Sequence, residues 1–351
     1  MRSAMDTLIK HLADGKELSE REVRVAVEML LDESINEAKK ADFLRSLTEK
    51  GETAAEITYF VQACLERAVD PMINEMEFDG PTLDVCGTGG DKLDLFNVST
   101  TSMFVIAAGG AVVVKHGNRG ITSKSGGADV LEALGVNLEI PAEQFRECLR
   151  SAGVGFMYAP AYHPAFKVIA PVRQKLAGDG VRTIFNLIGP LLNPAKPECQ
   201  LVGICNESLA QVYADILQRL GRDSAWVVSG KTAGGAVVDE LSLMGESHIY
   251  KSGAYQDLVD ETVMPGDLGL TQCEVGDLVG GDAELNAQIL TDILSGKERG
   301  AKREMVLLNA GAGLACAGLV DDLAAGVIKA GDLIDSGAAL ERLHKLQKAA
   351  G

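Results

Sequence analysis

From Pro71 onward the sequence alternates short apolar runs with amphipathic stretches, and this alternation constrains the fold more than any other feature. The apolar runs predict strands at 82–87, 111–117, 154–159, 199–205 and 224–230. Between them, three stretches have helical periodicity and each ends at a glycine: 126–135, 142–153 and 208–221. Such an order is typical of a parallel sheet built from strand-helix-strand units. A hairpin is expected around Ser252 and Gly253, and helices from about Asp282 to the end.

The first 75 residues differ, because they contain only helical patterns. Ser19 with Glu22 and Thr53 with Glu56 have the spacing of capping boxes, and Gly51 is placed to end a helix. We therefore expect an α/β protein with a small all-helical N-terminal domain at 1–75. The larger α/β domain at 76–351 should hold a mainly parallel central sheet flanked by helices.

Composition excludes several classes of protein. No apolar run reaches the roughly 18 residues of a membrane span, and the N-terminus lacks a signal-peptide core, so we expect a cytoplasmic protein. The seven cysteines occur singly, without the paired spacing of a zinc site or a redox dithiol. A formal charge of -17 disfavours nonspecific binding to nucleic acid or anionic lipid. An anionic ligand must therefore be held by locally placed groups.

Ligands of open parallel sheets bind beyond the carboxyl ends of the strands, which points to the loops after 82–87, 111–117 and 224–230. The first of these loops is rich in glycine and leads into a helix start at Asn97, Ser99 and Thr100, an arrangement that favours a pyrophosphate-like anion. It is not a dinucleotide fingerprint, because Lys92 occupies the position of the third glycine. The segment at 229–232 is not a phosphate loop either, because Ala225 replaces its first glycine.

Charged side chains in these loops indicate a phosphate and metal site. Lys115 ends the second strand as a compact cation, and His116, Asn118 and Arg119 follow with directional hydrogen-bonding groups. The adjacent acids Asp239 and Glu240 lie in an apolar setting, where their burial would be costly without a cation. Magnesium, which commonly takes phosphate oxygens as further ligands, is the natural partner.

The motifs GTGGD, NVST, KHGNR, SKSG, APAYHP, PVR, NLIGPLLNP and DE occur in this order along the chain. Together they resemble the anthranilate phosphoribosyltransferase family of tryptophan biosynthesis, over nearly the whole length. The resemblance implies transfer of the 5-phosphoribosyl group of 5-phosphoribosyl 1-diphosphate to the amine of anthranilate, with Mg²⁺ as the metal. It also implies a cleft between the two domains, a segment at about 163–189 that crosses back to the helical domain, and a homodimer formed through that domain.

The resemblance also assigns roles to individual positions. The phosphoribosyl donor is expected at Gly87, Gly90, Asp91, Asn97, Val98, Ser99, Thr100, Lys115, Gly117, Asn118, Arg119 and Ser123. Anthranilate is expected at Gly87, Asn118, Tyr162, His163 and Arg173, and the metal at Ser99, Asp239 and Glu240. The catalytic set implied is Lys115, His116, Asn118 and Arg173.

Departures from the family pattern leave alternatives open. Leu95 replaces a threonine, Gly127 replaces a serine, and the approach to the acidic pair is longer, with Ser229 in the place of a histidine. A pyrimidine nucleoside phosphorylase would share the domain plan, a non-catalytic family member could bind nucleic acid, and a related transferase could use another aromatic amine. The retained acids and the negative charge argue against the nucleic-acid reading.

Overall fold

A computed structural model describes residues 2–120, 124–253 and 256–351. The chain divides into two compact units. The helical unit consists of Met1–Asp70 and Pro160–Pro194, and the α/β unit consists of Pro71–Ala159 and Ala195–Gly351. In the described ranges no helix has the length and apolar character that crossing a membrane requires.

The helical unit is built on four N-terminal helices: α1 (Arg2–Ala13), α2 (Glu20–Leu30), α3 (Glu37–Lys50) and α4 (Ala54–Leu65). The later segment adds α8 (Ala159–Tyr162), α9 (Ala170–Gly178) and short 3-10 helices at Pro164–Lys167, Ile184–Asn186 and Gly189–Leu191. Both predicted capping boxes are present, at Ser19 and at Thr53. Gly51 ends α3 with φ 87°, a backbone angle that favours glycine. Buried aromatic and aliphatic side chains such as Phe43, Leu47 and Phe60 form its core.

The α/β unit holds an eight-stranded sheet within its described residues, in the order β3-β2-β1-β4-β5-β7-β8, with β6 paired to β5. The strands are β1 (Thr82–Gly87), β2 (Val112–Gly117), β3 (Val154–Tyr158), β4 (Cys199–Gly203), β5 (Ser224–Lys231), β6 (Val237–Val238), β7 (Ser247–Gly253) and β8 (Gln256–Val263). Strands β1 to β5 are parallel to their neighbours in this group, whereas β6, β7 and β8 pair in antiparallel fashion. The five predicted strands and the hairpin are confirmed, and β6 was not predicted.

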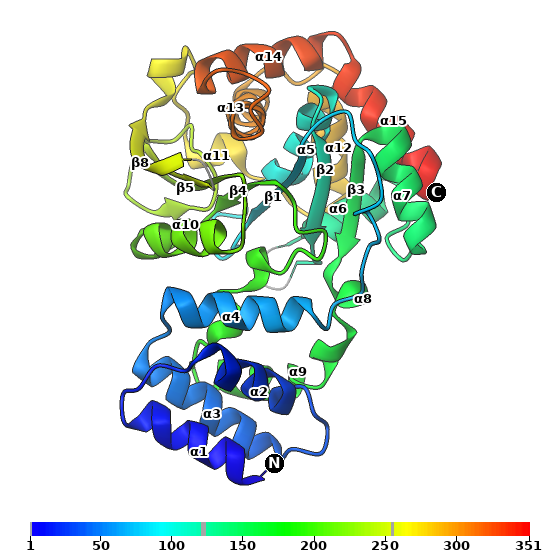
Figure 1. Ribbon diagram of the computed structural model, residues 1–351. Helices are drawn as coiled ribbons and strands as arrows, with labels where there is room; N and C mark the ends of the chain where they lie inside the picture. Colours follow the sequence, from blue (N-terminus) through cyan, green and yellow to red (C-terminus); the bar gives the residue numbers. More distant parts are fainter. Residues whose placement is uncertain (1, 121–123, 254–255) are drawn as a thin grey trace. The chain divides into compact units, whose positions relative to one another are not determined.

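Helices cover both faces of this sheet. The helices of the unit are α5 (Val98–Ala108), α6 (Gly127–Ala133), α7 (Ala142–Ala152), α10 (Ala210–Arg219), α11 (Val275–Leu278), α12 (Ala283–Leu294), α13 (Ala301–Cys316), α14 (Leu323–Asp335) and α15 (Ala338–Ala350), with 3-10 turns at Glu207–Leu209 and Pro265–Leu268. Helix α13 lies against β4 and β5 on one face, and α10 packs on β5 and β7 from the other (Figure 1). Because helices cover both faces, a ligand site is expected at the carboxyl ends of the parallel strands.

Candidate active site

Strands β1 and β2 separate before they reach this edge. Backbone pairing joins Thr82 to Val112 and Leu83 to Val113. Beyond these pairs, side-chain hydrogen bonds connect the two strands. The Asp84 carboxylate accepts the N–H of His116 at 3.2 Å, and the Lys115 ammonium donates to the carbonyl of Val85. The separation therefore places a buried cation, Lys115, between the carboxyl ends of the two strands.

The same ammonium connects β2 to the first turn of α5. Lys115 Nζ donates to Ser99 Oγ at 3.2 Å. The neighbouring Thr100 is buried, and a Cβ built on Gly127 would lie 2.7 Å from its hydroxyl oxygen. A serine at position 127, as in the family pattern, would therefore crowd Thr100 in this chain. The loop after β1, the start of α5 and the end of β2 thus form one cluster.

The glycine loop after β1 has a backbone that side chains would strain. Gly89 and Gly90 have φ angles of 72° and 97°. Asp91 follows them, and its carboxylate accepts the N–H of Leu93 at 3.1 Å. Burial and the nearby charge of Asp94 raise the pKa of Asp91. An acid in this loop therefore gains from a cation or a ribose hydroxyl.

The predicted acidic pair lies at the same edge of the sheet. The short strand β6 pairs with the end of β5 and leads directly to Asp239, whose Oδ2 accepts the N–H of Gly89 at 2.6 Å. A Cβ on Gly87 would lie only 2.3 Å from that oxygen, so the close approach depends on glycine. Burial and the charge of Asp91 raise the pKa of Asp239 to about 6. These contacts place the end of β6 directly on the glycine loop.

Glu240 completes this negative cluster. Burial together with the charge of Asp239 raises the pKa of Glu240, against the opposing effect of Lys115. Three acids, Asp91, Asp239 and Glu240, thus influence one another around one buried lysine. A site with this surplus of negative charge favours a cation.

The oxygen donors present fit Mg²⁺ better than a transition metal. Within the described ranges no three His, Cys, Asp or Glu side chains form a metal-binding group. The donors gathered are the carboxylates of Asp239 and Glu240 and the hydroxyl of Ser99, all hard oxygen atoms. Mg²⁺ is usually held by one or two carboxylates, and water or phosphate oxygens fill its remaining positions. The residues present fit such a partial set.

The other predicted donor-binding residues surround this cluster or lie apart from it. Asn97 precedes α5, and its amide donates to the carbonyl of Ser125 at 3.3 Å while its oxygen accepts from Asn286 at 2.8 Å. Arg119 instead pairs with Glu132 at 2.6 Å and lies over the ring of Tyr158. Four further predictions complete the set: Val98 is buried, Gly117 ends β2 against the ring of Phe156, the exposed Asn118 accepts the N–H of Arg119 at 2.8 Å, and Ser123 lies outside the described residues.

Three predicted residues belong to the helical unit. Tyr162 and His163 are buried; His163 Nε2 lies 2.8 Å from the carbonyl oxygen of Leu192, and burial lowers the pKa of His163. Arg173, on α9, is partly exposed and lies with its guanidinium 5.1 Å from the ring centre of Phe185. Burial lowers the pKa of Arg173 as well. This arginine therefore lies on an aromatic ring with part of its side chain buried.

Comparison with known proteins places this geometry in a family. A model described as "Glycosyl transferase family, a/b domain" matches residues 79–340, and one described as "Glycosyl transferase family, helical bundle domain" matches residues 6–68. Anthranilate phosphoribosyltransferase of Chloroflexus aggregans is 44% identical over 331 residues, which cover 94% of each chain. The chain belongs to the anthranilate phosphoribosyltransferase family. The corresponding protein of Natronomonas pharaonis is 40% identical over 346 residues, covering 98% of this chain and 99% of that one.

Solved structures of the family have the same fold. The crystal structure of anthranilate phosphoribosyltransferase from Thermus thermophilus matches with a TM-score of 0.88 and 36% identity, covering 98% of this chain and 99% of that chain. The Saccharomyces cerevisiae protein in complex with PRPP and Mg matches with a TM-score of 0.84 and 25% identity, covering 100% and 98%. The family resemblance and the fold class predicted from the sequence are confirmed.

Two features of this family member were not predicted from the sequence. Gly203 ends β4, and a Cβ built there would lie 1.6 Å from the carbonyl oxygen of Asp239. A glycine at the end of an apolar strand is the signal that could have identified it. Leu95, which departs from the family pattern, forms an isolated antiparallel bridge with Val279 and packs on the core. The leucine thus serves the packing of the loop.

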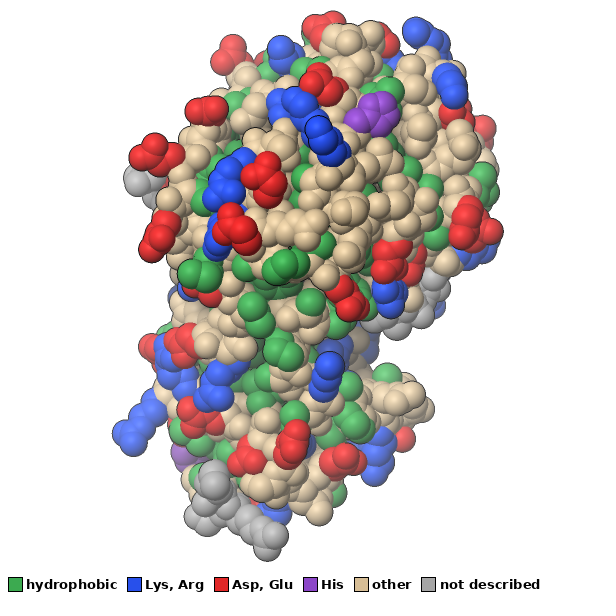
Figure 2. Space-filling view, turned by 90° about the vertical axis from the view of Figure 1, so that its right-hand side faces the viewer, with side chains coloured by type: hydrophobic (Ala, Val, Ile, Leu, Met, Phe, Trp, Pro, Cys, Tyr) green, Lys and Arg blue, Asp and Glu red, His purple; other side chains and the backbone are tan. Residues whose placement is uncertain are grey.

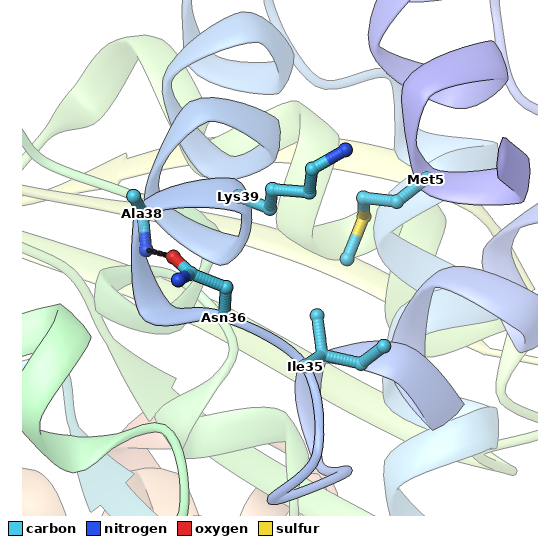
Figure 3. A pocket seen from close by; sticks show the side chains of 5 residues that line it. All are labelled: Met5, Ile35, Asn36, Ala38 and Lys39. Carbon is cyan, nitrogen blue, oxygen red and sulfur yellow. Dashed lines mark hydrogen bonds between the residues drawn. The ribbon is translucent and has the colours of Figure 1, made fainter. Parts of the chain in front are cut away.

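A separate cavity of about 540 Å³ lies in the helical unit. Figure 3 shows its lining: Met5 from α1, Ile35, and the start of α3 with Asn36, Ala38 and Lys39. Asn36 Oδ1 accepts the N–H of Ala38 at 2.8 Å and so caps α3. The cavity contains none of the residues that the family resemblance assigns to substrates.

Charge on the outer surface agrees with the sequence composition. On the face drawn in Figure 2, acidic and basic side chains of the described residues are interspersed, and no continuous basic patch covers that face. Among the described residues, some surface charges form exposed ion pairs, such as Arg219 with Asp215 and Arg150 with Glu147. Such a face offers no extended track for a nucleic acid backbone.

Proposed function

We propose that this chain binds 5-phosphoribosyl 1-diphosphate and Mg²⁺ and transfers the phosphoribosyl group to the amine of anthranilate, giving N-(5-phosphoribosyl)anthranilate and pyrophosphate in tryptophan biosynthesis. The observation that carries the proposal is the meeting of three strand ends in the α/β unit. Asp239, after β6, accepts the N–H of Gly89 in the glycine loop at 2.6 Å. Lys115, at the end of β2, donates to the carbonyl of Val85 in β1 and, at 3.2 Å, to Ser99 at the start of α5.

The diphosphate and phosphate groups of the donor are assigned to the glycine loop and its surroundings. The amides of the loop and of the first turn of α5 suit anions, and Lys115 adds a full positive charge. The proposed set is Gly87, Gly90, Asp91, Asn97, Val98, Ser99, Thr100, Lys115, Gly117, Asn118, Arg119 and Ser123. Arg119 can contribute only by exchanging its ion pair with Glu132 for a phosphate.

Ser99, Asp239 and Glu240 are the residues proposed to hold Mg²⁺. When bound, Mg²⁺ supplies charge stabilisation for the departing diphosphate. Asp239 itself accepts the N–H of Gly89 at 2.6 Å and so orients that amide. Lys115 stabilises the developing negative charge from the side of β2.

Anthranilate is assigned to Gly87, Asn118, Tyr162, His163 and Arg173. The planar guanidinium of Arg173 suits a carboxylate, and its seat on Phe185 pre-orders the side chain. A fixed carboxylate would direct the aromatic amine at the ribose C1, a proximity effect that can contribute roughly 7 kcal/mol or more. Asn118 supplies an amide that can fix the amine.

The reaction needs little base catalysis, because an aromatic amine is neutral and nucleophilic at pH 7. Its nitrogen forms a bond to C1 as the bond from C1 to the diphosphate oxygen breaks, and the diphosphate leaves with the electron pair. The amine then loses a proton, and His116 is the candidate to receive it. Positioning and charge stabilisation therefore carry the rate.

We further propose that the protein is a cytoplasmic homodimer formed through the helical unit. The family resemblance supports this assembly. Sedimentation velocity of the purified chain tests it. A species with twice the chain mass is expected, and a monomer at micromolar concentration would contradict it.

A fluorescence assay tests the activity directly. Purified protein is mixed with anthranilate, 5-phosphoribosyl 1-diphosphate and Mg²⁺, and loss of anthranilate fluorescence is followed. Loss that requires all three components is the expected result. A parallel reaction with uridine or thymidine and phosphate tests the nucleoside phosphorylase alternative, and release of free base there with no loss of anthranilate would overturn the proposal.

A further inference from the structure

The backbone just after the acidic pair is held by one side chain from a distant helix. Asn309, fully buried on α13, accepts the N–H of Leu241 through Oδ1 at 2.9 Å and donates from Nδ2 to the carbonyl of the same residue at 2.9 Å. Its Nδ2 also donates to the carbonyl of Met305 at 3.0 Å, within its own helix. The amide thus satisfies both backbone groups of Leu241, as a neighbouring strand would.

Two glycines, one in β4 and one in β5, lie against the backbone of Asp239 and Glu240. A Cβ on Gly203 would lie 1.6 Å from the carbonyl oxygen of Asp239, and one on Gly230 would lie 2.5 Å from that of Glu240. The acidic pair therefore runs directly across the ends of β4 and β5, where any larger residue would displace it. The backbone pairing of β6 with β5 ends at Val238. Three residues later, Asn309 supplies the hydrogen bonds to the backbone of Leu241.

We propose that Asn309 is a positioning residue for the metal-binding acids. By fixing Leu241 against α13, it holds the preceding Asp239 and Glu240 with their carboxylates beside the amides of Gly89 and Ser99. Like charges this close repel, so an unfastened segment would move the carboxylates apart and away from a shared cation. This inference rests on the proposed function, since it presumes that these acids bind Mg²⁺.

The test measures the Mg²⁺ requirement of donor binding, without turnover. Binding of 5-phosphoribosyl 1-diphosphate is followed by calorimetry in the absence of anthranilate, over a series of Mg²⁺ concentrations. Two variants are compared with the unaltered chain: Asn309→Ala removes the amide, and Asn309→Leu removes it while it keeps most of the volume. Loss of residues that support metal ligands typically lowers metal affinity by roughly 10- to 100-fold. We expect a rise of that size in the Mg²⁺ concentration for half-maximal binding.

Leu314→Ala is the matched control, because it also removes buried volume from α13. Leu314 packs beneath Gly109, where a Cβ would lie 2.3 Å from its Cδ2, and so contacts a different element. It should lower the melting temperature and leave the Mg²⁺ requirement within about twofold, as expected for sites without shared partners.

Three outcomes decide between the inference and its premise. A raised Mg²⁺ requirement in the folded Asn309 variants alone supports the positioning role. An unchanged requirement in either folded variant, or an equal rise in Leu314→Ala, overturns it. Mg²⁺-independent binding, or no donor binding by the unaltered chain, overturns the proposed function instead.

Discussion

Both units bury carboxylates, and two of these sites differ in how their buried charge is compensated. In the helical unit, Glu56 is fully buried and accepts the N–H groups of Leu18 at 2.9 Å and Thr53 at 3.0 Å, while Lys50 adds its ammonium at 2.6 Å. In the α/β unit, Asp239 and Glu240 are adjacent in the chain. The charge of Lys115 acts on Glu240, but its ammonium donates to Ser99 and to the carbonyl of Val85.

The difference separates a structural charge from a binding site. The groups that compensate Glu56 are its capping partner Thr53, Leu18 and Lys50, and all of them belong to the helical unit. The acidic pair instead keeps a surplus of negative charge, which raises the pKa of Asp239 to about 6 because of burial and the charge of Asp91. Buried charge without a compensating partner lowers the stability of the fold. Its presence therefore indicates a functional site.

The largest expected effect follows from neutralising the acidic pair. Asp239→Asn with Glu240→Gln should lower Mg²⁺-dependent turnover by roughly 1,000-fold or more, as expected when a transition-state charge loses its support. The free energy of unfolding without Mg²⁺ should stay equal or rise, because repulsion is relieved. The fluorescence assay and urea unfolding measure the two effects. Normal turnover by the double variant would refute the metal assignment.

The reverse pattern is expected for the helical unit. Glu56→Gln leaves Lys50 buried without its acid, and breaking a buried ion pair costs about 3 to 5 kcal/mol of unfolding free energy. Turnover per folded molecule and the Mg²⁺ requirement should not change. Urea unfolding and active-site titration measure these quantities.

The double variant Glu56→Gln with Lys50→Met serves as the control, because it removes both charges and should recover part of the loss. If Glu56→Gln instead altered the Mg²⁺ requirement and left stability intact, the division between a structural and a functional carboxylate would be wrong.

Arg173 extends the comparison to a cation. Burial lowers the pKa of this guanidinium, and the ring of Phe185 supports it at 5.1 Å. Arg173→Ala should raise the KM for anthranilate by roughly 100-fold, the worth of a charge-assisted pair, and leave the KM for the phosphoribosyl donor within about threefold. Arg173→Lys keeps the charge without the planar fork and should fall between the two. Equal increases in both KM values would count against the anthranilate assignment.

The acidic pair should also make stability depend on pH. In the folded protein burial raises the pKa of Asp239 to about 6 and also raises that of Glu240, whereas the unfolded chain ionises both near pH 4. As the pH rises from about 4 the unfolded state loses its protons first, so stability falls, and the loss ends once the folded acids have ionised. Without Mg²⁺, the free energy of unfolding should drop by about 3 kcal/mol or more over this range, because one pKa unit corresponds to about 1.4 kcal/mol.

Urea unfolding at a series of pH values measures this slope. The Asp239→Asn, Glu240→Gln variant is the control and should show a flatter profile between pH 4 and pH 8. A slope that is the same in both proteins would mean that other groups cause the dependence.

Much of the fold and part of the candidate site could be predicted from the sequence. The features that could be predicted depend on local signals, and those that could not depend on contacts between distant residues. Strand and helix periodicity, the capping boxes at Ser19 and Thr53 and the family motifs are local signals, and the structure agrees with them. The roles of Gly203 and Asn309 depend on contacts between distant parts of the chain, since Asn309 and Leu241 are 68 positions apart. The ion pair of Arg119 with Glu132 likewise depends on tertiary structure, because in the sequence each residue indicates only a surface charge.

The smallest expected change in unfolding free energy comes from an exposed ion pair, which serves as the reference for the two buried carboxylate sites. Asp6 and Lys39 form an ion pair on the surface of the helical unit at 2.6 Å, with the Asp6 side chain 57% exposed. Water and salt screen such a pair, so Asp6→Asn should change the unfolding free energy by about 0.5 kcal/mol or less. Urea unfolding in low and high salt measures it, and the small difference should vanish in high salt. A loss comparable to that of Glu56→Gln would show that burial does not separate structural from incidental charges in this unit.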